Sequence, residues 1–352
     1  MSTVTILGAG VMGSAMCLPV ADKGHAVRLV GTHLDTGIID SVKATGRHPK
    51  LNVLLPDTVR AFHHEEFAAA LGTDTDLIVL GVSSAGVGWA IDRLCEALKA
   101  PIPVVMITKG MQPEESFLTA LPDHVAVNVK RRTGLDLSVA AIGGPCIAGE
   151  LAVRRHTGTV ITARDVELAE KLCAMLETEY YHPRVSADVI GVEICAAFKN
   201  FFAIGVGWAA GHQEKMAPTE NRAFNHNAAA ILVDQAIREL MILVRAHGGT
   251  EQSVWGMPGA GDLYVTCQAG RNSRLGNNLG RGLTYSETKA GPMKGDTIEG
   301  AELGVAVATT LRTMMREGVL DAASLPLTSA LLDALTQDAA LDSPWTSFHR
   351  QS

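Results

Sequence analysis

Short apolar runs alternate with helix-length segments through the first half of the chain. The clearest of these runs are rich in β-branched residues and are bounded by glycine, proline or polar residues; they are Thr3–Leu7, Ala26–Val30, Asp76–Val82, Pro103–Thr108 and Ser138–Gly143. Such runs are typical of buried parallel strands joined by crossover helices. Two further runs, Gly158–Thr162 and Glu179–Asp188, are expected to add strands to the same sheet.

The pattern changes after Asp188, where long segments with helical periodicity replace the short runs. Within the segment Asn227–Gly249, two final glycines give a stop signal, and the expected apolar face consists of Ile231, Ile237, Leu240, Met241 and Val244. The sequence therefore predicts an α/β domain over residues 1–188, followed by an all-α C-terminal domain over residues 189–352.

A glycine-rich turn follows the first expected strand. Gly8, Gly10 and Gly13 have the spacing G-x-G-x-x-G, a helix is expected directly afterwards, and the next strand begins at Ala26. In this setting the first glycine permits a tight turn, the second lets a pyrophosphate approach the backbone, and the third lets helix and strand pack closely. The first domain is thus predicted to be a Rossmann-type dinucleotide-binding domain; the alternative is a glycine turn without a ligand.

The end of the second expected strand does not distinguish NAD from NADP. An NAD-selective site usually has an acidic residue there for the ribose hydroxyls, and an NADP-selective site usually has an arginine. This chain has Gly31, Thr32 and His33 at that point, and Asp35 comes slightly later. We expect NAD or NADP as the cofactor, and the sequence leaves the choice open.

Composition excludes several classes of protein. Of the 352 residues, 47% are apolar and 19% are charged, which is the balance of a globular protein. The formal net charge of −7 argues against nucleic acid or an anionic membrane as the main partner. The N-terminus does not resemble a secretory signal, and the six cysteines are scattered. We expect a cytoplasmic protein with no membrane insertion, no disulfide framework and no bound metal.

The stretch Glu193–Gly211 is apolar almost all round, yet Lys199 and Asn200 lie at its centre. Lysine is among the residues least often fully buried. One interpretation is a lysine whose stem packs while its charge reaches water. The other is catalysis: in a cleft, desolvation lowers the pKa of a lysine, so that it can exchange a proton near neutrality.

Other candidate residues follow expected strands or occupy polar turns. Lys109 and Gly144 each follow a strand, and the carboxyl ends of parallel strands are where such sheets bind ligands. In the second half, Asp262 is followed nine residues later by Arg271 and Asn272, a pair able to bind a phosphate through a guanidinium and an amide. The alternatives are an ordinary surface lysine and a solvated basic loop.

The order and spacing of these motifs resemble the NAD(P)-dependent glycerol-3-phosphate dehydrogenase family over almost the whole chain. The matching segments are GAGVMGSA, TKG, GGPCIAGE, GVEICAAFKNFFAIGVG, NAAAIL, GAGDLYVTC, GRNSRLG and IEGAELG. The resemblance implies an oxidoreductase that transfers a hydride between NAD(P) and C2 of sn-glycerol 3-phosphate or dihydroxyacetone phosphate. It also implies a homodimer.

The resemblance further implies roles for individual residues. Lys199 would act as the general acid/base for the C2 hydroxyl, and Lys109 and Asp262 would complete the catalytic set. Substrate contacts would come from Lys109, Gly144, Asn227, Asp262, Arg271 and Asn272. Cofactor contacts would come from Gly8, Gly10, Val11, Met12, Gly13, Ala148, Arg271 and Glu299.

This chain also departs from the common family pattern. Cys146 and Gly270 stand where many members have serine, and the segment His212–His226 extends the connection between two long helices. A close alternative is therefore the same chemistry on another polyol phosphate, such as a four-carbon one. More distant alternatives are a 3-hydroxyacid dehydrogenase or ketopantoate-type reductase, and a non-catalytic dinucleotide sensor.

Overall fold

The computed structural model describes residues 1–216, 220, 223–343 and 345–348 and divides the chain into two compact units. The first unit contains residues 1–109 and 121–189, and the second contains residues 110–120 and the chain from residue 190 onward. The observed change at residue 189 lies next to the expected boundary. Residues 110–120, however, were expected in the first domain and belong to the second unit.

The segment 110–120 is tied to the second unit by a small hairpin, formed by β8 (Met111–Pro113) and β9 (Leu118–Ala120). The hydroxyl of Thr310 donates a hydrogen bond to the carbonyl of Glu114 at 2.5 Å. The backbone N–H of Leu118 donates to Nε2 of His247 at 3.3 Å. The second unit is therefore helical with one added hairpin from residues 110–120, and the predicted all-α C-terminal domain is confirmed over its own residues, where every described element is a helix.

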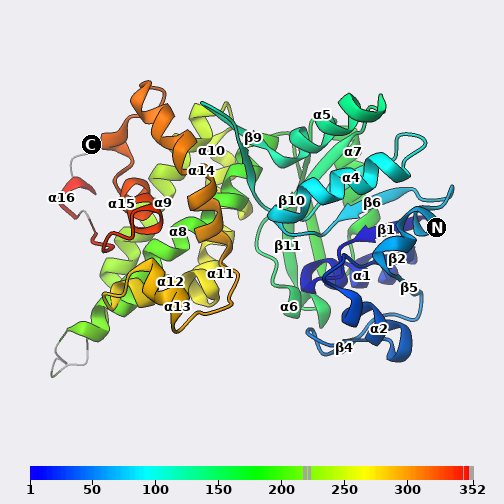
Figure 1. The fold of residues 1–352 in the computed structure, drawn as a ribbon, viewed down its shortest axis with the longest axis horizontal. Helices are drawn as coiled ribbons and strands as arrows, with labels where there is room; N and C mark the ends of the chain where they lie inside the picture. Colours follow the sequence, from blue (N-terminus) through cyan, green and yellow to red (C-terminus); the bar gives the residue numbers. More distant parts are fainter. Residues whose placement is uncertain (217–219, 221–222, 344, 349–352) are drawn as a thin grey trace. The chain divides into compact units, whose positions relative to one another are not determined.

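The first unit is built on an eight-stranded sheet with the order β12-β11-β10-β7-β6-β1-β2-β5 (Figure 1). Its strands are β1 (Thr3–Leu7), β2 (Ala26–Val30), β5 (Val59–Phe62), β6 (Leu77–Leu80), β7 (Val104–Met106), β10 (Val139–Gly143), β11 (Thr157–Ala163) and β12 (Tyr181–Ser186). All seven predicted runs contain strands. Neighbouring strands are parallel except for β10 and β11, which are antiparallel.

Helices cover both faces of this sheet, as in other doubly wound folds. One buried core includes residues from α1 (Val11–Asp22), α2 (Thr36–Thr45), α6 (Ala148–Ala152) and α7 (Val166–Leu176). A second core includes residues from α3 (Phe67–Leu71), α4 (Val87–Ala97) and α5 (Leu121–Thr133). The unit also contains the strand pair β3 (Arg47–His48) and β4 (Val53–Leu54), and the 3-10 turns η1 (His64–Glu66) and η2 (Ser84–Gly86).

The second unit is organised around α8 (Val189–Lys215). Its other elements are α9 (His226–Ala246), α10 (Glu251–Trp255), the π turn η3 (Met257–Gly261), α11 (Asp262–Gln268), α12 (Arg271–Gly280), α13 (Tyr285–Ala290), α14 (Glu299–Arg316), η4 (Ala322–Ser324), α15 (Pro326–Thr336) and α16 (Trp345–Phe348). Phe198, Phe201 and Phe202 of α8 are fully buried. Among the described helices, α8 alone is long and apolar enough to cross a membrane, but 94% of its most apolar window is buried inside the protein, as in a core helix.

The packing of α9 differs from the expected face at one position. Ile237, Leu240 and Val244 are buried as predicted, whereas Ile231 is 39% exposed. Leu232 takes its place in the core and is fully buried. The apolar residues at the start of α9 are consecutive in the sequence. A consecutive apolar stretch does not show which of its residues faces the core.

Candidate active site

The glycine-rich turn between β1 and α1 is shaped by backbone packing. Gly8 has a φ of +117°, and a Cβ at this position would lie 2.6 Å from the carbonyl of Gly81, which follows β6. A Cβ on Gly13 would lie 2.0 Å from the carbonyl oxygen of Gly8. Neither position can take a side chain without moving the backbone, because strand, turn and helix already touch.

Gly10 has a different environment. It is the N-cap residue of α1, no side chain caps the first N–H groups of the helix, and a Cβ on Gly10 would have no atom within 4 Å. Val11 is 41% exposed, and Met12 packs partly against the core. Uncapped N–H groups at a helix start attract anions. The open space beside them fits the pyrophosphate of a dinucleotide.

Lys109 and Gly144 lie together in the first unit. They follow the adjacent parallel strands β7 and β10, and Nζ of Lys109 donates a hydrogen bond to the carbonyl oxygen of Gly144 at 3.2 Å. Ala148 begins the short helix α6 in the same connection and is partly buried. The structure thus places these three candidates at the carboxyl-end edge of the sheet, where such folds bind ligands.

Lys199 is 7% exposed on α8 and does not reach outward to water. Its ammonium donates hydrogen bonds to Oδ1 of Asp262 at 2.8 Å and to the hydroxyl of Thr266 at 2.7 Å. Asp262 is only 2% exposed, and the Thr266 hydroxyl donates to its backbone carbonyl at 2.7 Å. The interpretation of Lys199 as a snorkelling lysine is therefore wrong. Burial disfavours the ammonium, and the buried carboxylate favours it.

The helices α8 and α12 cross closely, and this crossing brings Asn200 of α8 to Asn272 of α12. A Cβ on Gly211 of α8 would lie 1.8 Å from the carbonyl oxygen of Asn277, and one on Gly276 of α12 would lie 1.9 Å from that of Ile204. Backbone therefore packs directly on backbone at this crossing. This contact holds α12 against the second half of α8.

An amide chain joins three helices next to Lys199. The side-chain N–H of Asn272 donates to Oδ1 of Asn200 at 3.0 Å, and Asn200 in turn donates to Oε2 of Glu299 at 3.2 Å. The backbone N–H of Gly300 donates to Oδ1 of Asn272 at 2.9 Å. Asn200 and Asn272 are 6% and 9% exposed, so these bonds fix the geometry of a largely dry site.

Arg271 is the first residue of α12, and its side chain is about half exposed. Its guanidinium is 3.7 Å from Oε1 of Glu299, and both side chains are about half exposed, at 46% and 56%. An ion pair of this kind contributes roughly 0–1 kcal/mol and is easily exchanged. Gly270, just before it, has a φ of +123°, a conformation that a serine would adopt only with strain.

Sequence reasoning missed two members of this cluster of side chains. Thr266 and Asn200 contact the reacting cluster directly, although neither was proposed as a site residue. Thr266 follows Asp262 by four residues on one helix, so helical spacing could have identified Thr266, whereas the position of Asn200 next to Lys199 in the sequence does not place the two side chains on one face. Asn227, expected near the substrate, is exposed in the first turn of α9.

The extension between α8 and α9 lies only partly within the described residues, since residues 217–219 and 221–222 fall outside them. Phe224, Asn225 and His226 line a groove of about 420 Å³ together with residues of α8 and α12. Asn225 is fixed there by a hydrogen bond from its side chain to the carbonyl of Ala209 at 3.0 Å. The extension thus shapes the surface beside α12.

The cysteines and the possible metal-ligating side chains were also compared with the site. The six cysteines are free thiols, and burial raises the pKa of Cys267, beside the site, to about 12 despite the nearby charge of Lys199. Within the described part of the chain, no group of three or more His, Cys, Asp and Glu side chains is arranged to hold a metal ion.

A dinucleotide cradle on a doubly wound sheet, with a buried lysine on a helical unit, defines a nicotinamide-dependent dehydrogenase. Two family models match the chain: the NAD-dependent glycerol-3-phosphate dehydrogenase N-terminus over residues 3–169, and the C-terminus of the same family over residues 188–345. The chain therefore belongs to the NAD-dependent glycerol-3-phosphate dehydrogenase family, whose members use NAD or NADP.

Individual relatives agree with this assignment. The NADP(+)-dependent glycerol-3-phosphate dehydrogenase of Archaeoglobus fulgidus is 35% identical over 81% of this chain and 82% of its own. The glycerol-3-phosphate dehydrogenase [NAD(P)+] of Bacillus cytotoxicus is 27% identical over 95% of this chain and 91% of its own. The crystal structure of glycerol-3-phosphate dehydrogenase from Coxiella burnetii is 26% identical, with a TM-score of 0.80 over 99% of this chain and 98% of that one.

Proposed function

We propose that this protein interconverts sn-glycerol 3-phosphate and dihydroxyacetone phosphate, with Lys199 as the general acid/base. The buried ion pair between Lys199 and Asp262 carries the proposal, because it places a fixed proton donor beside the start of α12. The relatives from Archaeoglobus and Bacillus are glycerol-3-phosphate dehydrogenases, and each matches most of the chain.

The proton step follows from the contacts of Nζ. In the reducing direction, the ammonium of Lys199 gives one proton to the oxygen on C2, and the resulting neutral amine regains a proton from solvent. In the oxidising direction, the neutral amine takes the hydroxyl proton. Asp262 and Thr266 hold Nζ at 2.8 and 2.7 Å, so the lysine presents the same atom to the substrate in both directions. Bound NAD(P) supplies or accepts the hydride at C2.

The phosphate of the substrate would be bound at the start of α12. Arg271 forms a 3.7 Å contact with Glu299, and its planar guanidinium can form two parallel hydrogen bonds to a phosphate. Asn272, fixed by Asn200 and by the N–H of Gly300, adds an oriented amide. These groups would hold the phosphate while Lys199 acts at C2.

Lys109, Gly144 and the glycine-rich turn belong to the first unit. We assign the turn to the coenzyme, because the open space at Gly10 fits a pyrophosphate. Val11, Met12, Ala148 and Glu299 stay predicted cofactor contacts, and Lys109, Gly144 and Asn227 stay predicted substrate contacts. The homodimer, the cytoplasmic location and the absence of membrane insertion likewise stay predictions.

The same chemistry on a four-carbon polyol phosphate is the second candidate. It is favoured by the extension between α8 and α9, which lines the groove beside α12 and so lies near the proposed phosphate site. The distant reductases are less well supported, because both family models match glycerol-3-phosphate dehydrogenases. A non-catalytic sensor would not require a buried lysine that is hydrogen-bonded to a carboxylate and a hydroxyl.

The deciding experiment measures initial rates with dihydroxyacetone phosphate and with a four-carbon ketose phosphate, each with NADH and NADPH. The proposed function predicts efficient turnover of dihydroxyacetone phosphate. A higher kcat/KM for the larger substrate would keep the role of Lys199 and change the substrate. Coenzyme binding without turnover of either substrate would favour the sensor.

A further inference from the structure

Ala9 lies between Gly8 and Gly10 in the glycine-rich turn and is fully buried. Both of its backbone polar groups are bound by side chains. Its N–H donates a hydrogen bond to Oδ2 of Asp35 at 3.2 Å, and its carbonyl oxygen lies 3.1 Å from Nε2 of His48. Buried backbone groups need partners, which secondary structure usually supplies. At Ala9, two side chains from outside the turn supply them.

The contacts of the His48 ring determine which of its nitrogens carries the proton. A carbonyl oxygen accepts hydrogen bonds and cannot donate them, so Nε2 carries the proton that it donates to Ala9. The backbone N–H of Leu51 donates to Nδ1 at 3.0 Å, so Nδ1 carries no proton. Burial lowers the pKa of His48 below its ordinary value, and the charge of Lys50 acts in the same direction. The ring is therefore a neutral, fixed donor to the turn at about pH 7.

His48 reaches the turn from a separate hairpin. It lies in β3, which pairs with β4 outside the eight-stranded sheet. The guanidinium of Arg47 donates to the backbone carbonyl and to the side-chain oxygen of Asn52, both at 2.9 Å, and so closes the hairpin. Leu55, which follows β4, packs in the same core as Ala9. The hairpin is thus anchored beside the turn, and it carries the donor with it.

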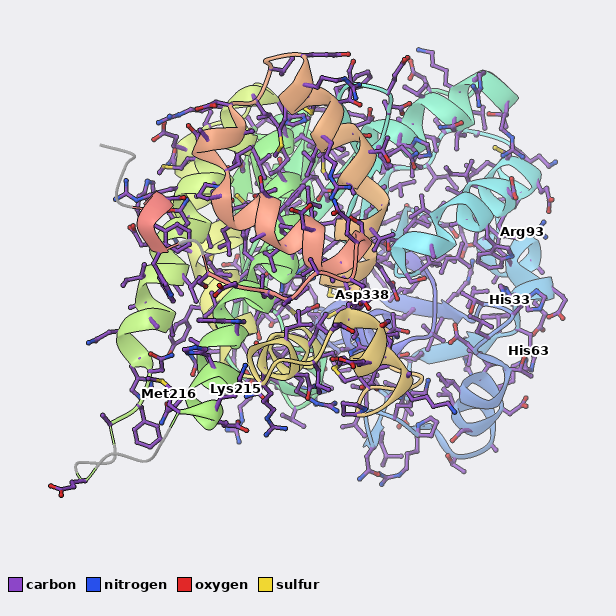
Figure 2. The ribbon with its side chains drawn as sticks, turned by 60° about the vertical axis from the view of Figure 1, so that its left-hand side comes forward. His33, His63, Arg93, Lys215, Met216 and Asp338 are labelled. Atoms are coloured by element: carbon purple, nitrogen blue, oxygen red, sulfur yellow. The ribbon has the colours of Figure 1, made fainter. Side chains whose placement is uncertain are left out.

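Asp35 ties a second segment to the same residue of the turn. Its Oδ2 accepts hydrogen bonds from the backbone N–H of Thr32 at 2.9 Å and from the hydroxyl of Thr32 at 2.8 Å, besides the one from Ala9. Figure 2 labels His33, which lies between Thr32 and Asp35 in the sequence and marks this segment on the first unit. The carboxylate is therefore oriented by its own segment, and it fixes the N–H of Ala9.

A hydrogen bond to the carbonyl of Ala9 also sets the direction of the next N–H group. This carbonyl and the N–H of Gly10 belong to one trans peptide, in which they point in opposite directions. His48 and the hydroxyl of Ser14, both buried, each lie 3.1 Å from the carbonyl oxygen. The N–H of Gly10 therefore points away from these buried side chains, beside the uncapped start of α1.

We propose that His48 is a positioning residue for the coenzyme: through the carbonyl of Ala9, it fixes the N–H of Gly10 as a donor to the pyrophosphate. Because this donor is oriented before the coenzyme binds, less conformational entropy is lost on binding. NADH and NADPH carry the same pyrophosphate, so His48 strengthens the binding of both equally. This inference rests on the proposed function, because that function assigns the glycine-rich turn to the coenzyme.

The test measures the dissociation constants of NADH and NADPH by titration calorimetry for the wild type and for His48→Leu. Leucine fills a similar volume and removes the donor. We expect both dissociation constants to rise about tenfold, because an oriented hydrogen bond to a charged group is weakened. At saturating coenzyme, kcat and the KM for dihydroxyacetone phosphate should stay near their wild-type values, because His48 acts on coenzyme binding and not on the proton step.

Two further variants separate loss of the donor from loss of stability. His48→Gln keeps a side-chain N–H able to reach the carbonyl of Ala9, so both dissociation constants should return to within about threefold of the wild type. Leu55→Ala loosens the packing of the same hairpin and removes no hydrogen bond to Ala9. It should lower stability in urea, measured without coenzyme, and leave both dissociation constants nearly unchanged.

Wild-type affinity in His48→Leu would overturn the inference. An equal loss of affinity in His48→Gln or in Leu55→Ala would also overturn it, because the effect would then not depend on the donor. These binding readouts do not require turnover, so the predicted losses in a protein that does not reduce dihydroxyacetone phosphate would support the role of His48 and contradict the proposed function. Failure of the wild type to bind either coenzyme would overturn the two together.

Discussion

The glycine-rich turn of the first unit and the Lys199 cluster of the second are built in different ways. The turn uses backbone from one short stretch, and its shape is set by contacts such as that of Gly13 with the carbonyl of Gly8. The Lys199 cluster uses side chains from separate helices, with Lys199 and Asp262 lying 63 residues apart. A site formed by backbone atoms can be recognised from the spacing of residues in the sequence. A site formed by side chains depends on how the helices that carry them cross.

The two units also differ in the charges they bury. Among the described residues, the buried Asp, Glu and Lys side chains are Glu193, Lys199, Glu239 and Asp262, and all four belong to the second unit. Buried charge is costly unless it is paired or hydrogen-bonded. The helical unit therefore carries polar groups that constrain its geometry, and the sheet unit is stabilised mainly by apolar packing.

The largest expected effect is on catalysis. Lys199→Met should lower kcat by about 1000-fold, roughly 4 kcal/mol, because the proton donor at C2 is lost. Coenzyme affinity, measured by titration, should change little, since the glycine-rich turn is untouched. The double variant with Asp262→Asn controls for the carboxylate that is left unpaired, and Lys171→Met controls for the loss of an exposed lysine. Turnover near the wild-type level would remove Lys199 from the mechanism.

The next effect is on the stability of the first unit. Gly13→Ala should lower the free energy of unfolding by about 3 kcal/mol or more, because the new Cβ meets backbone at 2.0 Å. Gly10→Ala is the matched control: its Cβ faces open space, so it should leave stability unchanged and weaken coenzyme binding. Urea denaturation with and without coenzyme distinguishes the two variants. Equal loss of stability in the two variants would contradict the roles assigned to these glycines.

The third effect concerns Glu239, whose carboxyl oxygens accept hydrogen bonds from Gln235, Leu327 and Thr328. Burial raises the pKa of Glu239 from 4.5 to about 7. Between these values the folded protein keeps a proton that the unfolded chain releases, so this contribution to stability is complete below pH 4.5 and is lost as the pH rises through about 7.

The corresponding loss of stability is about 3 kcal/mol, and Glu239→Gln should abolish it. Chemical denaturation across this pH range measures the effect as the difference between the wild type and the variant. Glu167→Gln, at an exposed position of α7, provides the control. If the free energy of unfolding of the wild type and of Glu239→Gln depended on pH in the same way, Glu239 would have the same pKa in the folded and unfolded states.

The smallest effect tests the amide chain. Asn272→Ala should destabilise the second unit by about 2 kcal/mol, because the buried N–H of Gly300 and the amide of Asn200 lose a partner. It should also raise KM more than Asn278→Ala does, since the side chain of Asn278 donates to the carbonyl of Arg274 within α12. Thermal unfolding and steady-state kinetics measure the two effects, and equal KM values would confine Asn272 to a structural role.

Sequence reasoning succeeded where a feature is local. The strands β1 and β2 have the predicted limits, and the turn after β1 has the expected glycines. It failed where tertiary contacts decide between similar residues. The hairpin at 110–120 joins the helical unit through Thr310 and His247, which are distant in sequence, and Ile231 gives way to Leu232 in the core of α9.

By itself, the sequence determined an α/β unit with a glycine-rich turn, a helical unit and a lysine within an apolar helix. The period of apolar residues and the conformational limits of glycine fix these features over a few neighbouring residues. Only the tertiary structure decided that Lys199 meets Asp262 and Thr266, and that Asn200 meets Asn272. Those contacts depend on backbone packing between α8 and α12 at Gly211 and Gly276, which spacing along the chain does not encode.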